Sequence, residues 1–105
     1  MDKYDALSLA RQYASLIKTN FDCEQIFLFG SYTKETYHDE SDIDIAVILK
    51  EFDNPMDIQL KLMRLRRKID GRIEPHPFRE KDFNVSNPVV HEILKHGQRI
   101  DILSY

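Results

Sequence analysis

The chain has 105 residues, enough for one domain over residues 1–105 with a modest core and one site, but without room for a separate substrate-binding domain. Its formal net charge is −3 at pH 7, so bulk electrostatics give no reason to expect nucleic-acid binding. The lone Cys23 excludes an intramolecular disulfide, and no apolar run is long enough for a signal core or a membrane span. We therefore expect a cytoplasmic protein.

The first third of the chain predicts a helix, a strand and a short second helix. Residues 5–19 are predicted to form a helix, because the apolar residues Leu7, Ala10, Ala14 and Ile17 recur at helical spacing. Residues 25–29 are rich in isoleucine and phenylalanine, which predicts the first strand. Gly30 then turns the chain, and we expect a short helix over residues 31–35.

The middle of the chain predicts a buried strand followed by an amphipathic helix. Residues 43–49 are apolar apart from Asp44, which is typical of a central strand that is buried on both faces. Before this strand, residues 38–40 form a polar loop. Asn54 and Pro55 supply the cap and first residue of a helix that runs to about residue 69. Its apolar stripe consists of Ile58, Leu62, Leu65 and Ile69.

The last third predicts two strands on either side of a helix. Residues 72–78 form the third strand, and two prolines within it indicate a strand that lies at the sheet edge or ends early. Asn87 begins the next helix and Gly97 ends it, before a half-exposed last strand over residues 98–103. Alternating helices and strands predict a two-layer α/β (α+β) domain, although the order of the strands cannot be derived from this pattern.

Two short motifs point to chemistry on a nucleotide. Gly30 and Ser31 follow an apolar strand, where backbone N–H groups can bind a phosphate, most effectively if a helix begins there. Ten residues later come Asp42 and Asp44, whose side chains point to one face if both lie on a strand. Two neighbouring carboxylates repel each other unless a cation lies between them. A phosphate site followed by a carboxylate pair indicates a nucleotide bound with magnesium.

This pattern of Gly-Ser, a ten-residue spacer and Asp-x-Asp between two apolar strands resembles the DNA polymerase beta-like nucleotidyltransferase superfamily. The spacer is similar to that of the minimal nucleotidyltransferases, which look like the antitoxin partners of HEPN-type toxins. The resemblance implies a mixed sheet with helices packed mainly on one face. It also implies two magnesium ions and ATP or another nucleoside triphosphate, although no residue here reads the base. The resemblance is sharp over residues 25–49 and looser over residues 72–78.

The resemblance implies that three carboxylates act as catalytic residues and magnesium ligands. Asp42 and Asp44 are the first two, because carboxylate oxygens suit this ion. The third is expected on a later strand, and Glu74 is the best candidate. Glu74 would ligate the catalytic ion and either accept the acceptor's proton or hold the ion that lowers its pKa. Asp70 is the rival, but it stands at a helix end, where aspartate is common in turns.

Four residues are assigned to the nucleotide by the same resemblance. Gly30 and Ser31 should hold the β- and γ-phosphates, since glycine permits close approach and the serine hydroxyl adds a donor. Lys34 follows Ser31 by three residues and can reach the triphosphate. Ser41 is expected to cap or orient the Asp42 loop rather than to bind the ion directly. Family members often have a glycine in the run corresponding to residues 33–35, and this chain has none.

Other polar residues have two interpretations each. His76 shares the face of Glu74 on an ideal strand, so it either contacts phosphate or acceptor or is a partly exposed polar residue. A basic stripe on the helix after Asn54 is either its solvent face or a surface that docks an acidic partner, and comprises Lys61, Arg64, Arg67 and Lys68. The spacing of Cys23 with His38, His91 and His96 does not indicate a zinc site.

These features lead to three hypotheses of function. The first is a magnesium-dependent nucleotidyltransferase that moves AMP from ATP to a hydroxyl of a partner protein, a tyrosine of a HEPN-type toxin by resemblance. The second is a binding module that neutralises its partner by occlusion, with a vestigial metal site. The third is a transferase of the antibiotic-modifying kind, which would need its acceptor site from a dimer or another subunit. A homo- or hetero-oligomer is compatible with each.

Overall fold

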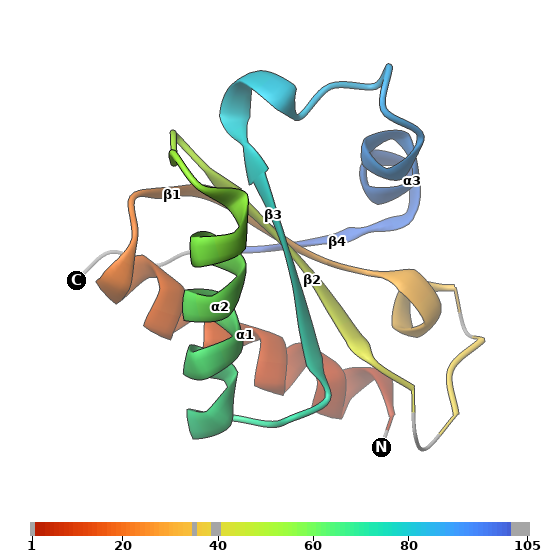
Figure 1. Cartoon of the computed structure of the whole chain (residues 1–105). Helices are drawn as coiled ribbons and strands as arrows, with labels where there is room; N and C mark the ends of the chain where they lie inside the picture. Colours follow the sequence, from red (N-terminus) through yellow and green to blue (C-terminus); the bar gives the residue numbers. More distant parts are fainter. Residues whose placement is uncertain (1, 35, 39–40, 102–105) are drawn as a thin grey trace.

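A computed structural model describes residues 2–34, 36–38 and 41–101 of the chain. Within these residues it forms three α-helices and one four-stranded mixed sheet (Figure 1). In chain order the elements are α1 (Lys3–Asn20), β1 (Cys23–Phe29), the 3₁₀ turn η1 (Gly30–Thr33), β2 (Ile43–Leu49), α2 (Pro55–Leu65), η2 (Arg66–Lys68), β3 (Ile73–Arg79), η3 (Glu80–Asp82), α3 (Pro88–His96) and β4 (Gln98–Ile100). No helix in the described part of the chain is both long and apolar enough to span a membrane.

The sheet has the strand order β3-β2-β1-β4. β1 pairs antiparallel with both β2 and β4, whereas β2 and β3 run parallel. The apolar strand β2 is therefore central, as predicted, and six of its seven residues are buried, with Asp44 as the exception. The last strand is paired over Gln98–Ile100, while residues 102 and 103 of the predicted strand lie outside the described residues.

Helices cover the two faces of the sheet unequally (Figure 1). α1 and α2 pack on one face, where alternate residues of the strands join them in the larger hydrophobic core, with members such as Ile17, Ile45 and Leu62. The other face has a smaller core of Phe27, Phe29, Ala46, Ile48 and, from α3, Ile93. This arrangement confirms the expected mixed sheet with helices mainly on one face, and it leaves part of the second face open.

Local signals account for the helix ends. The Asn54 side chain accepts hydrogen bonds from the backbone N–H groups of Met56 and Asp57, at 2.9 and 3.3 Å, and so caps α2. The helix predicted to reach residue 69 ends earlier as an α-helix, since its last turn tightens to the 3₁₀ turn η2. α1 also begins two residues before the predicted start, because Asp2 and Asp5 form a capping box.

β3 lies at the sheet edge, as its two prolines predict, yet it continues to Arg79. Its backbone groups alternate between facing β2 and facing away. The Arg72 carbonyl, one residue ahead of the strand, accepts a hydrogen bond from the Ile43 amide of β2. The carbonyls of Ile73 and Pro75 instead accept hydrogen bonds from the side chains of Arg66 and Gln59. Pro75 therefore stands where no N–H is needed for pairing with β2, and Pro77 occupies the next such position.

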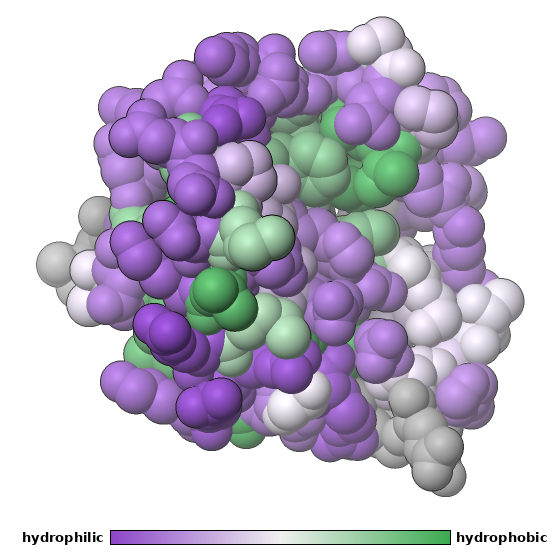
Figure 2. Space-filling view, in the orientation of Figure 1, coloured by the Kyte–Doolittle hydropathy of each residue, from purple (hydrophilic) through white to green (hydrophobic). Residues whose placement is uncertain are grey.

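The outer surface of α2 and η2 combines basic and apolar side chains. All four residues of the predicted basic stripe are exposed, namely Lys61, Arg64, Arg67 and Lys68. Met56 and Leu60 are also exposed on this helix, by 72 % and 50 %. Figure 2 shows apolar surface over α2, surrounded by hydrophilic atoms. The stripe is therefore exposed, as both of its interpretations require.

Tyr13 connects α1 to α2 through a buried hydrogen bond. Its ring is fully buried, and its hydroxyl donates to the Leu62 carbonyl at 2.7 Å. Burial raises the pKa of this hydroxyl well above its usual value, so it is protonated at any ordinary pH. We expect Tyr13→Phe to lower the free energy of unfolding by about 1 kcal/mol, because the carbonyl keeps its intrahelical donor.

Urea denaturation measures this prediction. Tyr4→Phe is the matched control, since the Tyr4 side chain is exposed and its hydroxyl contributes no buried bond. A Tyr13→Phe protein as stable as the control would show that the buried bond contributes nothing to stability.

Candidate active site

Two of the three predicted carboxylates, Asp44 and Glu74, lie side by side where β1 ends and where β2 and β3 begin. In the parallel register Asp44 of β2 is paired with Glu74 of β3, and in the antiparallel register Asp44 is paired with Phe29 of β1. Neighbouring strands lie about 4.8 Å apart, so the Asp44 and Glu74 side chains are adjacent. Because Ile43 and Ile45 face α1 and α2, Asp44 points to the opposite, more open face.

Gly30 brings the backbone against Asp44. Its φ is +80°, in the left-handed region that favours glycine, and a Cβ built on it would lie 2.4 Å from Asp44 Oδ2. The short helix predicted over residues 31–35 is instead the four-residue 3₁₀ turn η1, which begins at Gly30, and Glu35 lies outside the described residues. Thr33 Oγ1 donates to the Gly30 carbonyl at 2.8 Å and closes this turn. The Gly-Ser turn and the carboxylate therefore form one compact site.

His76 joins the site from β3. Its Nε2 lies 3.0 Å from Asp44 Oδ1, although its direct partner across the ladder is Ala46. Because Ala46 is small, the imidazole can extend diagonally over it to Asp44. The Phe29 ring meets the imidazole edge-on at 5.0 Å between centroids. His76 is thus partly exposed and contacts Asp44, and its contact with phosphate or acceptor stays a prediction.

The two candidates for the third carboxylate have different surroundings. Glu74 is adjacent to Asp44 and partly exposed. Its cationic neighbour is Arg66, whose Nη1 lies 3.8 Å from Glu74 Oε2. Asp70 accepts two hydrogen bonds from the Arg72 guanidinium, from Nε to Oδ1 at 2.9 Å and from Nη2 to Oδ2 at 2.7 Å. These hydrogen bonds hold the pKa of Asp70 below its usual range. Geometry therefore places Glu74, and not Asp70, beside Asp44.

Asp42 is less fixed than Asp44. It lies one residue before β2 and is exposed, so the alternation of strand side chains orients Asp44 but not Asp42. Ser41 is buried beside it, and its hydroxyl accepts from the backbone N–H of His38 at 2.8 Å. This contact ties Ser41 to the loop ahead of β2, and its role in orienting Asp42 stays a prediction.

Lys34 has a partner that sequence reasoning missed. Its ammonium forms an ion pair with Glu92 of α3, which ties the segment after η1 to the second face of the sheet. Ser31 supports the same segment, since its carbonyl accepts from the backbone N–H groups of Lys34 and Thr36, each at 3.2 Å. A triphosphate bound at the Gly-Ser turn would therefore compete with Glu92 for the Lys34 charge.

The donor set suits a hard cation, but the described residues do not form a finished metal centre. No group of three His, Cys, Asp or Glu side chains within residues 2–34, 36–38 and 41–101 is close enough to hold an ion. Asp44 and Glu74 supply two adjacent carboxylates, and the exposed Asp42 is free of the strand pairing that fixes Asp44. Carboxylate oxygens are the ligands that Mg²⁺ prefers, so these residues fit that ion by chemistry.

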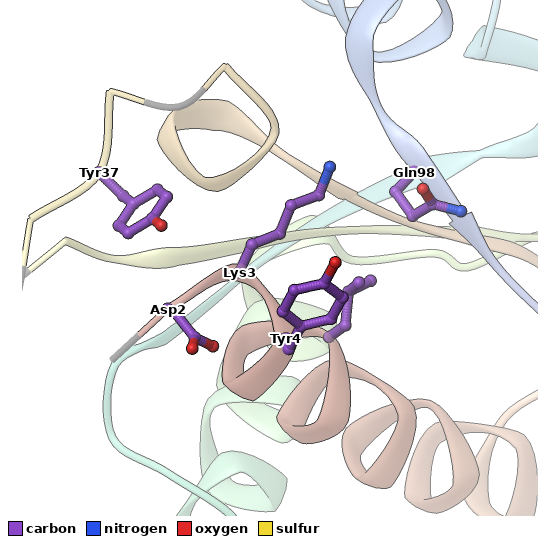
Figure 3. A pocket seen from close by; sticks show the side chains of 6 residues that line it. Asp2, Lys3, Tyr4, Tyr37 and Gln98 are labelled. Carbon is purple, nitrogen blue, oxygen red and sulfur yellow. The ribbon is translucent and has the colours of Figure 1, made fainter.

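A separate hollow lies beside the start of α1 (Figure 3). It is lined by Asp2, Lys3, Tyr4, Leu7, Tyr37 and Gln98. Leu7 belongs to the core on the α1 side of the sheet, so this hollow and the carboxylates lie on opposite faces. Tyr37 also stacks on the buried Tyr32, at 4.9 Å between centroids. The hollow is therefore no part of the candidate active site.

Comparison with known proteins supports one family. The family described as "Polymerase beta, Nucleotidyltransferase" matches residues 11–101. No curated protein matches the chain.

Three solved structures share the fold. A chain of a mutant MntA-HpeT toxin–antitoxin is 25% identical, with a TM-score of 0.64, over 86% of this chain and 69% of its own. A putative nucleotidyltransferase from Sulfolobus solfataricus is 27% identical, with a TM-score of 0.62, over 75% and 71%. A toxin–antitoxin solved with AMP-PNP is 24% identical, with a TM-score of 0.64, over 85% and 70%.

Proposed function

The chain belongs to the polymerase beta-like nucleotidyltransferase family, and we propose from this that it moves a nucleoside monophosphate from a nucleoside triphosphate to an acceptor hydroxyl. The acceptor oxygen bonds to the α-phosphorus and loses its proton, and the bond from the α-phosphorus to pyrophosphate breaks, so that pyrophosphate leaves. The observation that carries the proposal is the register that sets Asp44 beside Glu74 and next to the Gly30 turn. Little covalent chemistry falls to the protein in such a transfer, so positioning and charge neutralisation dominate.

Each residue of the site has a role in this reaction. Gly30 admits the triphosphate close to the backbone, and the Ser31 hydroxyl adds a donor. Asp42, Asp44 and Glu74 would hold magnesium, which supplies charge neutralisation at the phosphates and a lower pKa for the attacking hydroxyl. Lys34 would exchange its partner Glu92 for the triphosphate.

The proposed donor and acceptor are inferred from the similar structures. ATP is the proposed donor, since one structure of this fold was solved with AMP-PNP. The proposed acceptor is a tyrosine of a HEPN-type toxin, so that the chain acts as an antitoxin in the cytoplasm. Support comes from the 25% identity to a chain of the MntA-HpeT toxin–antitoxin. No residue described above reads the base, so GTP, CTP and UTP belong in the test.

Transfer of label tests the proposed function. The purified chain is incubated with magnesium, an α-labelled nucleoside triphosphate (ATP first, then GTP, CTP and UTP) and a candidate HEPN-type partner or cell lysate, next to the Asp42→Asn, Asp44→Asn double variant. We expect label on a tyrosine of the partner with the wild type and none with the double variant. No label from any of the four nucleotides, with a partner that co-purifies, would contradict nucleotidyl transfer.

A non-catalytic antitoxin is the second candidate. It is favoured by the absence of three converging metal ligands among the described residues and by the engagement of Lys34 with Glu92. In this case the chain neutralises its partner by covering it. The double variant separates the candidates in cells, because only a non-catalytic antitoxin protects as well as the wild type without its aspartates.

A further inference from the structure

The two oxygens of the Asp44 carboxylate have different neighbours. Oδ1 lies 3.0 Å from His76 Nε2, on the β3 side. Oδ2 points to Gly30, at 2.4 Å from the position that a Cβ on that residue would take. A partial rotation of the carboxylate about its last bond would turn the second oxygen away from Gly30, and the contact of the first oxygen with His76 opposes that rotation.

From this asymmetry we propose that His76 is a positioning residue for Asp44, which keeps Oδ2 turned to the Gly-Ser turn and available to a cation. The proposal rests on the proposed function. An ionised carboxylate offers only acceptors, so the imidazole must donate its Nε2–H to Oδ1.

The structure holds the imidazole itself in place. Phe29 meets the ring edge-on, at 64° between planes, and Phe29 is itself buried in the smaller core. Ala46, which is paired with His76 across the two strands, has a small side chain and so leaves room for the imidazole to reach Asp44 over the sheet surface. The His76 side chain is 36 % exposed. Its place on β3, the Phe29 ring and the Asp44 carboxylate together set its position.

Hydrogen bonds from outside the ligand set commonly orient metal-binding side chains. Their loss costs about 10- to 100-fold in metal affinity or activity. His76 has this place in the site, since it contacts a proposed ligand and lies two residues beyond Glu74, another proposed ligand, on the same face of β3. Its alternative role as a direct contact of phosphate would leave the affinity for a free ion unchanged.

Binding of Mn²⁺ to the purified chain, measured by electron paramagnetic resonance without nucleotide, tests the proposal. His76→Phe keeps an aromatic ring against Phe29 but removes the donor, and we expect about 10- to 100-fold weaker binding. His76→Gln keeps an N–H donor and should recover most of the affinity. His91→Phe is the matched control, because His91 is exposed on α3 and lies outside the site.

The outcomes separate this inference from the proposed function. Wild-type affinity in His76→Phe overturns the positioning role alone, whereas a wild type that binds no Mn²⁺ overturns the metal site and the positioning role together. Nitrogen-15 NMR of the imidazole serves if His76→Phe does not fold. We expect His76 to carry its proton on Nε2 and its signals to shift in Asp44→Asn, and a bare Nε2 would contradict the proposal.

Discussion

Replacing Asp44 by asparagine is expected to lower the rate of nucleotidyl transfer about 10³-fold, because it removes a fixed negative charge from the centre of the site. The protein should remain folded. Asparagine has the same shape, and its carbonyl oxygen can still accept the hydrogen bond that His76 gives to Oδ1. Transfer of label from α-labelled ATP, with circular dichroism as a check on folding, measures both effects. A variant that transfers at the wild-type rate would remove Asp44 from the mechanism.

A second pair of variants identifies the third carboxylate. Glu74→Gln should reduce transfer as strongly as Asp44→Asn, since the register places the two side chains together. Asp70→Asn should leave transfer unchanged and lower stability modestly, because Asp70 accepts three hydrogen bonds from Arg72. The reverse result would assign the third carboxylate to Asp70.

The stability loss in Asp70→Asn depends on pH. Arg72 lowers the pKa of Asp70 in the folded state, so the bonds stabilise the protein above the pKa of the unfolded chain. This stabilisation fades as the pH falls through the lower, folded-state value. Asp70→Asn and the wild type should therefore differ most near neutral pH and converge in acid.

Gly30→Ala is expected to have the largest effect on both folding and activity. A left-handed φ of +80° costs an alanine about 1–2 kcal/mol, and the new Cβ would lie 2.4 Å from Asp44 Oδ2. Either the turn or the carboxylate has to move. We expect the free energy of unfolding to fall by about 2 kcal/mol or more and transfer to be lost in the fraction that remains folded.

Gly71→Ala is the matched control for this substitution. A Cβ at Gly71 meets no atom within 4 Å, and its backbone is outside the left-handed region. Its stability should stay within about 0.5 kcal/mol of the wild type or rise slightly. Urea denaturation and the labelling assay compare the two variants. If Gly30→Ala behaved like Gly71→Ala, the close approach of the turn to Asp44 would not hold in solution.

The secondary structure could be predicted largely from local signals. The strand Ile43–Leu49 agrees with its predicted bounds because its apolar run is bordered by polar residues on both sides. The Asn-Pro pairs mark the starts of α2 and α3 for the same local reason. The start of α1 was predicted too late, because apolar periodicity begins only after the capping box of Asp2 and Asp5.

The site could be predicted only as far as its motifs are local. Gly30 and Asp44 belong to one short stretch of sequence, whereas the position of Glu74 and His76 depends on how β3 aligns with β2. That register is a non-local property, which alternation along one strand cannot reveal. The contacts of Arg66 with Glu74 and of Lys34 with Glu92 are hidden for the same reason.

The proline-containing edge of the sheet also limits how this protein can assemble. A free strand edge normally offers amides and carbonyls to a strand of another molecule. On the outer side of β3 the carbonyls of Ile73 and Pro75 are already occupied by Arg66 and Gln59, and the two prolines have no amide to offer. Strand addition at the β3 edge is therefore blocked, which protects this edge of the sheet from edge-to-edge pairing. A partner that approaches this side must bind through side chains.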